Sequence, residues 1–159
     1  METTHIITVL VNNTSGVLLR VSSLFARRNY NISSISASET EKPSIARMTI
    51  VTKGDKHALE QIYKQLMKII DVREIKVVTP EIAVCREHLL IKMENRDDTR
   101  PIIINIANLF GAKIVDSTTT SIIFELTGEH QKLASFITML KPYYLKQLVK
   151  TGITALERK

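Results

Sequence analysis

A short polar segment, Asn12-Asn13-Thr14-Ser15-Gly16, is the part of the chain best suited to bind a charged ligand. It lies between an apolar run that predicts a buried strand and a pattern of apolar residues at helical spacing. The first turn of a helix has free backbone N–H groups and the positive end of the helix dipole. Such a turn can hold a carboxylate or a phosphate. The alternative is that Asn, Ser and Gly only cap the helix.

An amino acid is the small anion that this segment fits best. Its carboxylate would accept hydrogen bonds from N–H groups near Ser15, Gly16 and Val17, because Gly16 has no side chain to keep the ligand from the backbone. Asn13 and Asn31 each offer an amide oxygen for the ammonium and an NH₂ group for the carboxylate. An apolar ligand side chain is expected near the apolar residues of the same region, Val17, Leu18 and Ile32.

Signals for catalysis or metal binding are weak. The four histidines stand singly, away from other ligand types at metal-binding spacing, so no metal site is predicted. The chain has no G-x-S-x-G motif and no evident pair of carboxylates, so no catalytic residue is predicted. The segment from Gly16 to Arg20 distantly resembles the phosphate-cradling turn of acylphosphatases, but the glutamine and the aromatic residue of that signature are missing.

Composition indicates an ordinary globular chain of 159 residues, with 44% hydrophobic and 24% charged residues. No apolar run reaches transmembrane length and no targeting segment is evident, so no membrane association is expected. The single cysteine, Cys85, suits a reducing cytoplasm. Net charge is +6, but no basic run exceeds Arg27-Arg28, so we expect a mildly basic solvated surface and no nucleic-acid partner.

The elements that position the polar segment follow the order βαββαβ. In the first half we predict strands at about 5–11, 32–38, 45–52 and 72–79, a helix at about 16–28, and a second helix that begins after Asp55 as its N-cap. The apolar stripe of the first helix comprises Val17, Leu18, Val21, Leu24 and Phe25. The stripe of the second comprises Leu59, Ile62, Tyr63, Leu66, Met67 and Ile70.

The second half repeats this order. Strands are predicted at about 83–93, 113–118, 121–126 and 145–150, followed by a separate segment at 153–156. The stripe of the third helix (Ile102, Ile103, Ile106, Leu109 and Phe110) lies 85 positions after that of the first helix. The stripe of the fourth (Leu133, Phe136, Ile137 and Leu140) lies 74 positions after the corresponding residues of the second.

This repeat predicts an α+β fold of two tandem ferredoxin-like βαββαβ units with antiparallel sheets. The expected domains are residues 1–79 and 80–159, joined at Thr79-Pro80-Glu81. Units of this size are marginally stable alone and leave sheet edges uncovered, so we expect dimerisation through the sheets.

The two copies differ at the candidate site. At an offset of 85 residues, Asn13 corresponds to Asp98 and Gly16 to Pro101. A carboxylate at a helix start repels an anion, and proline removes an N–H group. The sequence therefore predicts a ligand site in the first copy only.

RNA recognition motifs share the βαββαβ order and remain an alternative. That module stacks bases on aromatic residues of its central strands. The predicted strand at 45–52 has no aromatic residue, which favours packing against protein over stacking of bases.

The motifs resemble those of the ACT domain in the regulatory small subunit of acetohydroxyacid synthase (acetolactate synthase). They are Asn13-x-x-Gly16-Val17-Leu18, then Leu24-Phe25-x-Arg27-Arg28-x-Tyr30-Asn31-Ile32-x-Ser34, then Arg47-Met48-Thr49. The resemblance continues through Leu59-Glu60-Gln61-Ile62 and Val72, and returns at Arg86-Glu87 and Thr151-Gly152-Ile153. It spans nearly the whole chain.

This resemblance implies a non-catalytic subunit that has no cofactor of its own. Its partner would be a catalytic large subunit that carries thiamine diphosphate, Mg and FAD. The small subunit would raise the partner's activity and confer feedback inhibition by valine, leucine or isoleucine. It further implies a homodimer through the ACT domains, residues 1–79 here. The effector would contact Asn13, Thr14, Ser15, Gly16, Val17 and Leu18 of one protomer, and Asn31 and Ile32 of the other.

Two residues depart from the pattern of this family. Asn29 stands where glycine is common, and asparagine is the next-best residue for a left-handed helix cap. Leu19 stands where a smaller or polar residue is common, which would narrow the pocket or change the preferred effector.

Overall fold

The computed structural model describes residues 3–158 of the chain. It contains two compact units: unit 1 comprises Met1–Val84 and Gly152–Lys159, and unit 2 comprises Cys85–Thr151. The sequence-based division after Thr79 assigned residues 80–84 and 152–159 to the second domain, whereas in the structure they belong to unit 1. The difference arises because the C-terminal segment packs on the sheet of unit 1, far from it in sequence.

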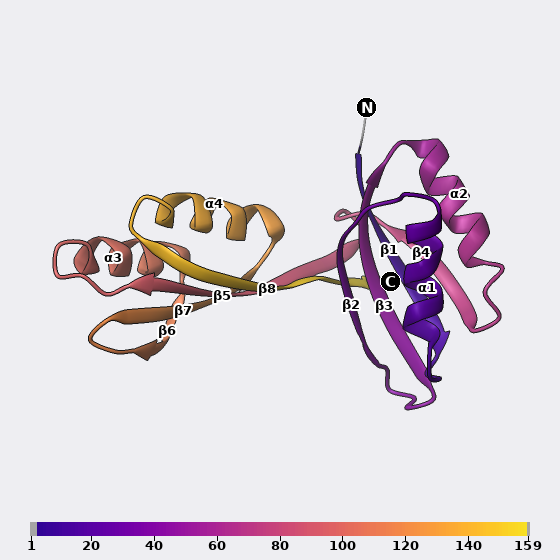
Figure 1. Ribbon diagram of the computed structural model, residues 1–159, viewed down its shortest axis with the longest axis horizontal. Helices are drawn as coiled ribbons and strands as arrows, with labels where there is room; N and C mark the ends of the chain where they lie inside the picture. Colours follow the sequence, from indigo (N-terminus) through magenta and orange to yellow (C-terminus); the bar gives the residue numbers. More distant parts are fainter. Residues whose placement is uncertain (1–2, 159) are drawn as a thin grey trace. The chain divides into compact units, whose positions relative to one another are not determined.

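Unit 1 is a βαββαβ sandwich of one sheet and two helices. Its elements are β1 (Thr3–Asn12), α1 (Val17–Arg27), β2 (Ile32–Glu39), β3 (Ile45–Gly54), α2 (Lys56–Leu66) and β4 (Val72–Val78). The strand order is β2-β3-β1-β4 with antiparallel pairing, so β2 forms one edge of this sheet. Both helices cover the same face of the sheet (Figure 1).

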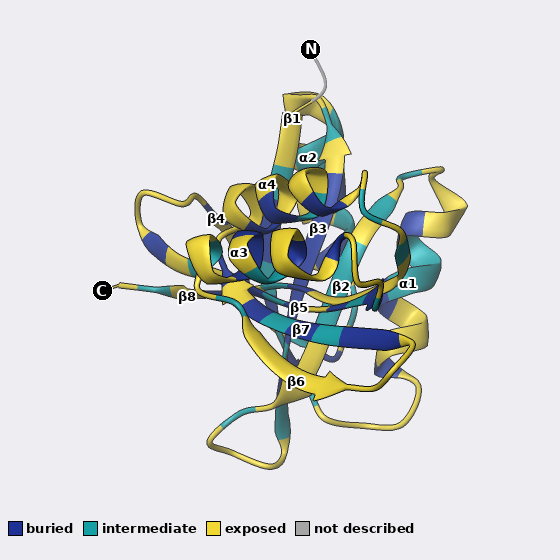
Figure 2. Cartoon of the chain, turned by 90° about the vertical axis from the view of Figure 1, so that its left-hand side faces the viewer, coloured by how far each residue is buried: buried dark blue, intermediate teal, exposed yellow. Residues whose placement is uncertain are grey.

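Unit 2 repeats this architecture. Its elements are β5 (Ala83–Glu94), α3 (Arg100–Phe110), β6 (Lys113–Ser117), β7 (Ser121–Gly128), α4 (His130–Leu140) and β8 (Leu145–Glu157). The strand order is β6-β7-β5-β8, and β6 is exposed along its whole length (Figure 2). The α+β fold with two βαββαβ units and antiparallel sheets is therefore confirmed.

The core of unit 1 agrees with the predicted stripes in part. Val17, Val21 and Phe25 of α1 are buried, but Leu18 is 47% exposed. In α2, Ile62 and Leu66 are buried as predicted. Leu59 is partly buried against the core, but the other three members of the stripe are exposed: Tyr63 by 41%, Met67 by 57% and Ile70 by 92%.

The prediction for Ile70 is wrong because α2 ends earlier than the apolar pattern suggests. After Leu66 the chain forms a turn, in which Ile69 N–H donates to Leu66 O at 3.1 Å. This turn brings Ile69 onto the core and points Ile70 into solvent.

The helices of unit 2 show one comparable error. Ile103 and Ile106 are buried, whereas Ile102 is 42% and Leu109 75% exposed, contrary to the predicted stripe. The helix α3 begins at Arg100, 83 residues after Val17 begins α1, so the offset of 85 does not align the two helix starts. The offset of 74 between the starts of α2 and α4, Lys56 and His130, is confirmed.

Both helix-terminus predictions in unit 1 are confirmed. The Asp55 side chain accepts a hydrogen bond from Ala58 N–H at 2.7 Å, as an N-cap does. Asn29 has φ 57°, and Tyr30 N–H donates to Phe25 O at 3.0 Å. This is the Schellman arrangement, which ends α1 and directs the chain into β2.

The C-terminal residues pack on the face of the unit 1 sheet opposite the helices. The predicted strand at 145–150 and the segment at 153–156 form one strand, β8, and its end belongs to unit 1. Ser36 Oγ donates to Ile153 O at 3.4 Å, and Arg158 N–H donates to Ile82 O at 2.9 Å. Gly152 has φ +81°, and a Cβ atom there would lie 2.8 Å from Ser34 Cβ. Close approach at Gly152 is therefore a condition for this docking.

We expect Gly152→Ala to destabilise unit 1 by about 2–3 kcal/mol, because it adds backbone strain and a steric clash. Gly111→Ala is the matched control, since Gly111 has φ +71° and open space around the added Cβ. Chemical denaturation measures the free energy of unfolding of both variants. The clash with Ser34 is supported if Gly152→Ala loses clearly more free energy of unfolding than Gly111→Ala does. Adding Ser34→Gly to Gly152→Ala should then restore the difference. Equal losses in the two variants contradict it.

Candidate functional site

The loop between β1 and α1 places Gly16 at the start of the helix. Gly16 is the N-cap with φ 80° and ψ 0°, a left-handed conformation, and no side chain caps the helix by a hydrogen bond. The first α-helical hydrogen bond is Arg20 N–H to Gly16 O at 3.0 Å. The N–H groups of Leu18 and Leu19 precede it and have no acceptor within the helix. They form the donor pair that an anion at this turn would meet.

Val17 lies in the core, as its place in the apolar stripe predicts, whereas the predicted effector site required its backbone and side chain to face a ligand. Its N–H donates to Thr14 O at 3.3 Å, and its side chain is 6% exposed in the core of unit 1. The N–H groups that are free to face a ligand are therefore those of Leu18 and Leu19. Leu18 is 47% exposed and supplies the apolar surface beside the turn.

A buried carboxylate lies behind this loop. Asp71 is 8% exposed and accepts hydrogen bonds from Arg20 Nε at 2.9 Å and from Thr14 Oγ1 at 3.2 Å. Arg20 Nη2 lies 2.7 Å from Asp71 Oδ2, and Asn12 N–H donates to Asp71 O at 2.8 Å. These contacts fix the end of β1 and the first turn of α1 against the start of β4.

The pair of Arg20 and Asp71 was not predicted as part of the site. Arg20 follows Gly16 by four residues, so it lies on the same face of α1. Its Nη1 atom lies 3.1 Å from the position of a Cβ atom on Gly16. Asp71 is 51 residues from Arg20 in sequence, and no local pattern connects the two.

Asn13 is held by the β2–β3 hairpin. Its Nδ2 atom donates to Glu39 Oε1 at 3.2 Å and to Pro43 O at 2.9 Å. The amide NH₂ that was assigned to a ligand carboxylate is thus engaged within the chain. The Asn13 amide oxygen and the Glu39 carboxylate are acceptors beside this loop, and both suit an ammonium group.

Asn31 and Ile32 lie far from this loop within one chain. Asn31 O accepts a hydrogen bond from Thr52 Oγ1 at 2.8 Å, and Ile32 pairs with Thr52 of β3. Asn12 pairs with Ile45 at the opposite end of β3. Ile45 and Thr52 are seven positions apart, which corresponds to roughly 23 Å along a strand. The two predicted halves of the site therefore cannot contact one small ligand in a single protomer.

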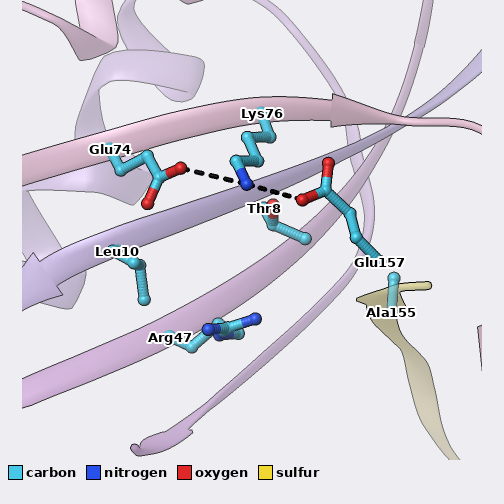
Figure 3. Close-up of a pocket in the computed structure, with 7 residues that line it drawn as sticks. All are labelled: Thr8, Leu10, Arg47, Glu74, Lys76, Ala155 and Glu157. Atoms are coloured by element: carbon cyan, nitrogen blue, oxygen red, sulfur yellow. Dashed lines mark hydrogen bonds and ion pairs between the residues drawn. The ribbon is translucent and has the colours of Figure 1, made fainter. Parts of the chain in front are cut away.

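Two recesses lie elsewhere on unit 1. The smaller, of about 40 Å³, is lined by Thr8, Leu10, Arg47, Glu74, Lys76, Ala155 and Glu157 (Figure 3). Lys76 Nζ lies 2.5 Å from Glu157 Oε2 and 3.2 Å from Glu74 Oε1. Hydrogen bonds to Glu157 and then Glu74 raise the pKa of Lys76 above its ordinary value. This recess has room for only a few water molecules and is far smaller than a typical ligand pocket.

The larger recess is a groove of about 660 Å³ between α1 and α2. Its lining residues are Leu19, Arg20, Ser23, Leu24, Arg27, Arg28, Gln65, Lys68, Ile69 and Ile70. Leu19 is 69% exposed and lines this groove, whereas the sequence placed it near the effector pocket.

The corresponding turn of unit 2 has a different chemistry. Pro101 occupies the first turn of α3. Arg96 Nε lies 3.2 Å from Asp98 Oδ1, and Arg100 Nη2 lies 3.5 Å from Asp97 Oδ1. Two carboxylates thus precede this helix, in contrast to the glycine-containing turn before α1.

Over residues 3–158, no group of three or more His, Cys, Asp or Glu side chains is placed to hold a metal ion. No helix in the same range is long and apolar enough to cross a membrane.

Comparisons with known proteins agree along both units. Residues 7–74 match the model of the AHAS small subunit-like ACT domain, and residues 86–159 match that of the small subunit of acetolactate synthase. The probable acetolactate synthase small subunit of Methanothermobacter thermautotrophicus is 42% identical over 98% of this chain and 93% of that protein. The acetolactate synthase small subunit of Bacillus subtilis is 42% identical over 97% of this chain and 90% of that protein.

A solved structure is similar as well. The crystal structure of the acetolactate synthase small subunit from Thermotoga maritima has a TM-score of 0.90 and 37% identity, over 99% of this chain and 98% of that one. The fold, the two family models and these relatives all agree with the resemblance seen in the motifs. The chain therefore belongs to the acetolactate synthase small-subunit family, whose members are regulatory ACT-domain subunits that leave catalysis to the large subunit.

Proposed function

We propose that this chain activates the catalytic large subunit of an acetolactate synthase and confers feedback inhibition by a branched-chain amino acid. The observation that carries the proposal is the free helix start at Gly16 beside apolar Leu18, in the unit that matches the ACT-domain model. Thiamine diphosphate, Mg and FAD would be held by the large subunit.

The proposed effector site combines complementary groups around one zwitterion. The ligand carboxylate accepts hydrogen bonds from the N–H groups of Leu18 and Leu19 at the positive end of α1. The ammonium faces the Asn13 amide oxygen and the Glu39 carboxylate, and Asn13 Nδ2 holds these two side chains together by donating to Glu39 Oε1 at 3.2 Å. The aliphatic side chain packs against Leu18.

A second protomer completes this site. Since Asn31 and Ile32 lie at the other end of β3, a twofold partner that runs antiparallel brings its Asn31 to the Gly16 loop. The edge strand β2 and the side of α1 that carries Leu18 are the surfaces that such a homodimer would use. Effector binding then stabilises one packing of the two protomers over another, which is the condition for allosteric control.

Titration of the reconstituted holoenzyme tests this function. We expect the small subunit to raise pyruvate-condensing activity, and valine, leucine or isoleucine to lower it again in a saturable manner. The isolated small subunit should turn over no pyruvate. Holoenzyme activity that none of the three amino acids changes would contradict the effector proposal. Turnover of pyruvate by the small subunit alone would contradict the regulatory role.

A further inference from the structure

The groove between α1 and α2 combines an apolar floor with an uncompensated basic rim. Leu24 and Ile69 are partly buried in it, while Leu19 and Ile70 are 69% and 92% exposed. Two strongly exposed aliphatic side chains, Ile70 and Leu19, thus line the same groove as the partly buried Leu24 and Ile69, and apolar side chains gathered in one hollow mark an interaction site better than isolated ones do. The groove therefore has the character of a binding surface.

The charges around the groove all have the same sign. Its lining includes Arg20, Arg27, Arg28 and Lys68 and no acidic residue. Asp71 pairs with Arg20, whereas no ion pair involving Arg27, Arg28 or Lys68 is found within residues 3–158. A partner that covers the apolar floor would therefore gain most from carboxylates at its margins.

The occupant that fits this chemistry is a protein segment. The groove offers aliphatic side chains and no aromatic residue, so it provides no surface on which nucleic-acid bases would stack. An amphipathic helix or extended segment, with apolar side chains flanked by Asp or Glu, would match both the floor and the rim.

The groove lies apart from the proposed effector and dimer surfaces. Leu19, Ser23 and Leu24 line it at helical spacing and face α2, whereas Leu18 lies on another side of α1. Arg20 lines the groove and also approaches Gly16, so the effector loop and the groove share one side chain. A change in the effector loop would therefore affect a partner bound in the groove through Arg20.

We propose that this groove is the docking site of an acidic, amphipathic segment of the catalytic large subunit. The inference rests on the proposed function, since it takes the large subunit as the partner. It assigns the contact surface on this chain to α1, α2 and the turn from Met67 to Asp71.

The test measures the affinity of the full-length chain for the catalytic large subunit by biolayer interferometry. Ile70→Ser removes the most exposed apolar group of the groove, and Lys68→Glu reverses a rim charge. Both positions are exposed, so both variants should fold normally. The matched controls are Leu109→Ser, 75% exposed on α3, and Lys64→Glu, an exposed lysine of α2 outside the groove.

We expect each groove variant to weaken association at least about tenfold, and each control to change it less than about twofold. Raising NaCl from about 50 to about 200 mM should weaken the association of the wild type with the large subunit more than that of Lys68→Glu, because salt screens the rim charges. Wild-type affinity in both groove variants, or equal losses in the controls, would overturn the assignment. Binding of the wild type and of Lys68→Glu to phosphatidylserine vesicles is measured alongside. If Lys68→Glu loses vesicle binding but keeps its affinity for the large subunit, the groove contacts membranes and the assignment is also overturned.

The test separates the two proposals. If the wild-type chain does not bind the large subunit at all, the proposed function fails and the docking site fails with it. If the wild type binds and activates the large subunit while the groove variants do the same, only the docking site is wrong.

Discussion

Gly16→Asp is expected to weaken effector binding by about 2–4 kcal/mol, or roughly 30- to 1000-fold in Kd. The new carboxylate would stand where the ligand carboxylate accepts hydrogen bonds from the backbone N–H groups of α1. A side chain at φ +80° is strained, and its Cβ would lie 3.1 Å from Arg20 Nη1. The added charge would also compete with Asp71 for Arg20.

Isothermal calorimetry with valine, leucine and isoleucine measures this loss. Gly111→Asp is the control, because Gly111 also has a left-handed φ, +71°, and lies after α3 in unit 2. It introduces the same charge and a similar backbone strain away from the site, so it should bind effector like the wild type. If Gly16→Asp binds the effector as tightly as the control does, the loop is not part of the effector site.

Arg20→Ala is expected to destabilise unit 1 by about 2–3 kcal/mol. It leaves the buried Asp71 carboxylate with Thr14 as its remaining side-chain donor, and an unpaired buried charge is strongly destabilising. Because the Arg20 side chain is 46% exposed, solvent screens the pair, and the expected loss lies below the full value for a buried ion pair.

A double-mutant cycle with Asp71→Asn measures this interaction by chemical denaturation. We expect the double variant to lose less stability than the sum of the two single variants, since each single variant removes the same contact. Lys64→Ala serves as a control for the removal of an exposed cation near α1 and α2. Strictly additive losses would show that Arg20 and Asp71 do not stabilise each other.

Local patterns were sufficient to predict the elements and most of the core. The cap at Asp55 and the left-handed Asn29 follow from the chemistry of single residues, and both are confirmed. Periodicity failed where a helix ended before its apolar pattern did. Ile70 continued the stripe of α2 in sequence, yet the turn after Leu66 placed Ile69 on the core instead.

The site was predictable only in its local part. The helix start at Gly16 could be predicted because strand, turn and helix are contiguous in sequence. The contact of Arg20 with Asp71 and that of Asn13 with Glu39 join residues 51 and 26 positions apart, which no spacing rule connects. The positions of Gly152 and the C-terminal segment depend on tertiary packing in the same way.

The separation of Asn13 and Asn31 along β3 is the strongest constraint on how this protein can bind an effector. It turns the proposed site into a statement about two protomers, and this statement has a direct consequence for mixed dimers. If one protomer supplies the Gly16 loop and the other supplies Asn31, lesions placed in different chains leave one site of the dimer intact.

Co-expression of Gly16→Asp and Asn31→Ala chains with two different tags allows the mixed dimer to be purified and titrated with valine by calorimetry. Neither variant homodimer should bind, while the mixed dimer should bind about one valine per two chains with wild-type affinity. A mixed dimer that binds no valine, although the wild-type dimer does, would contradict a site shared between protomers.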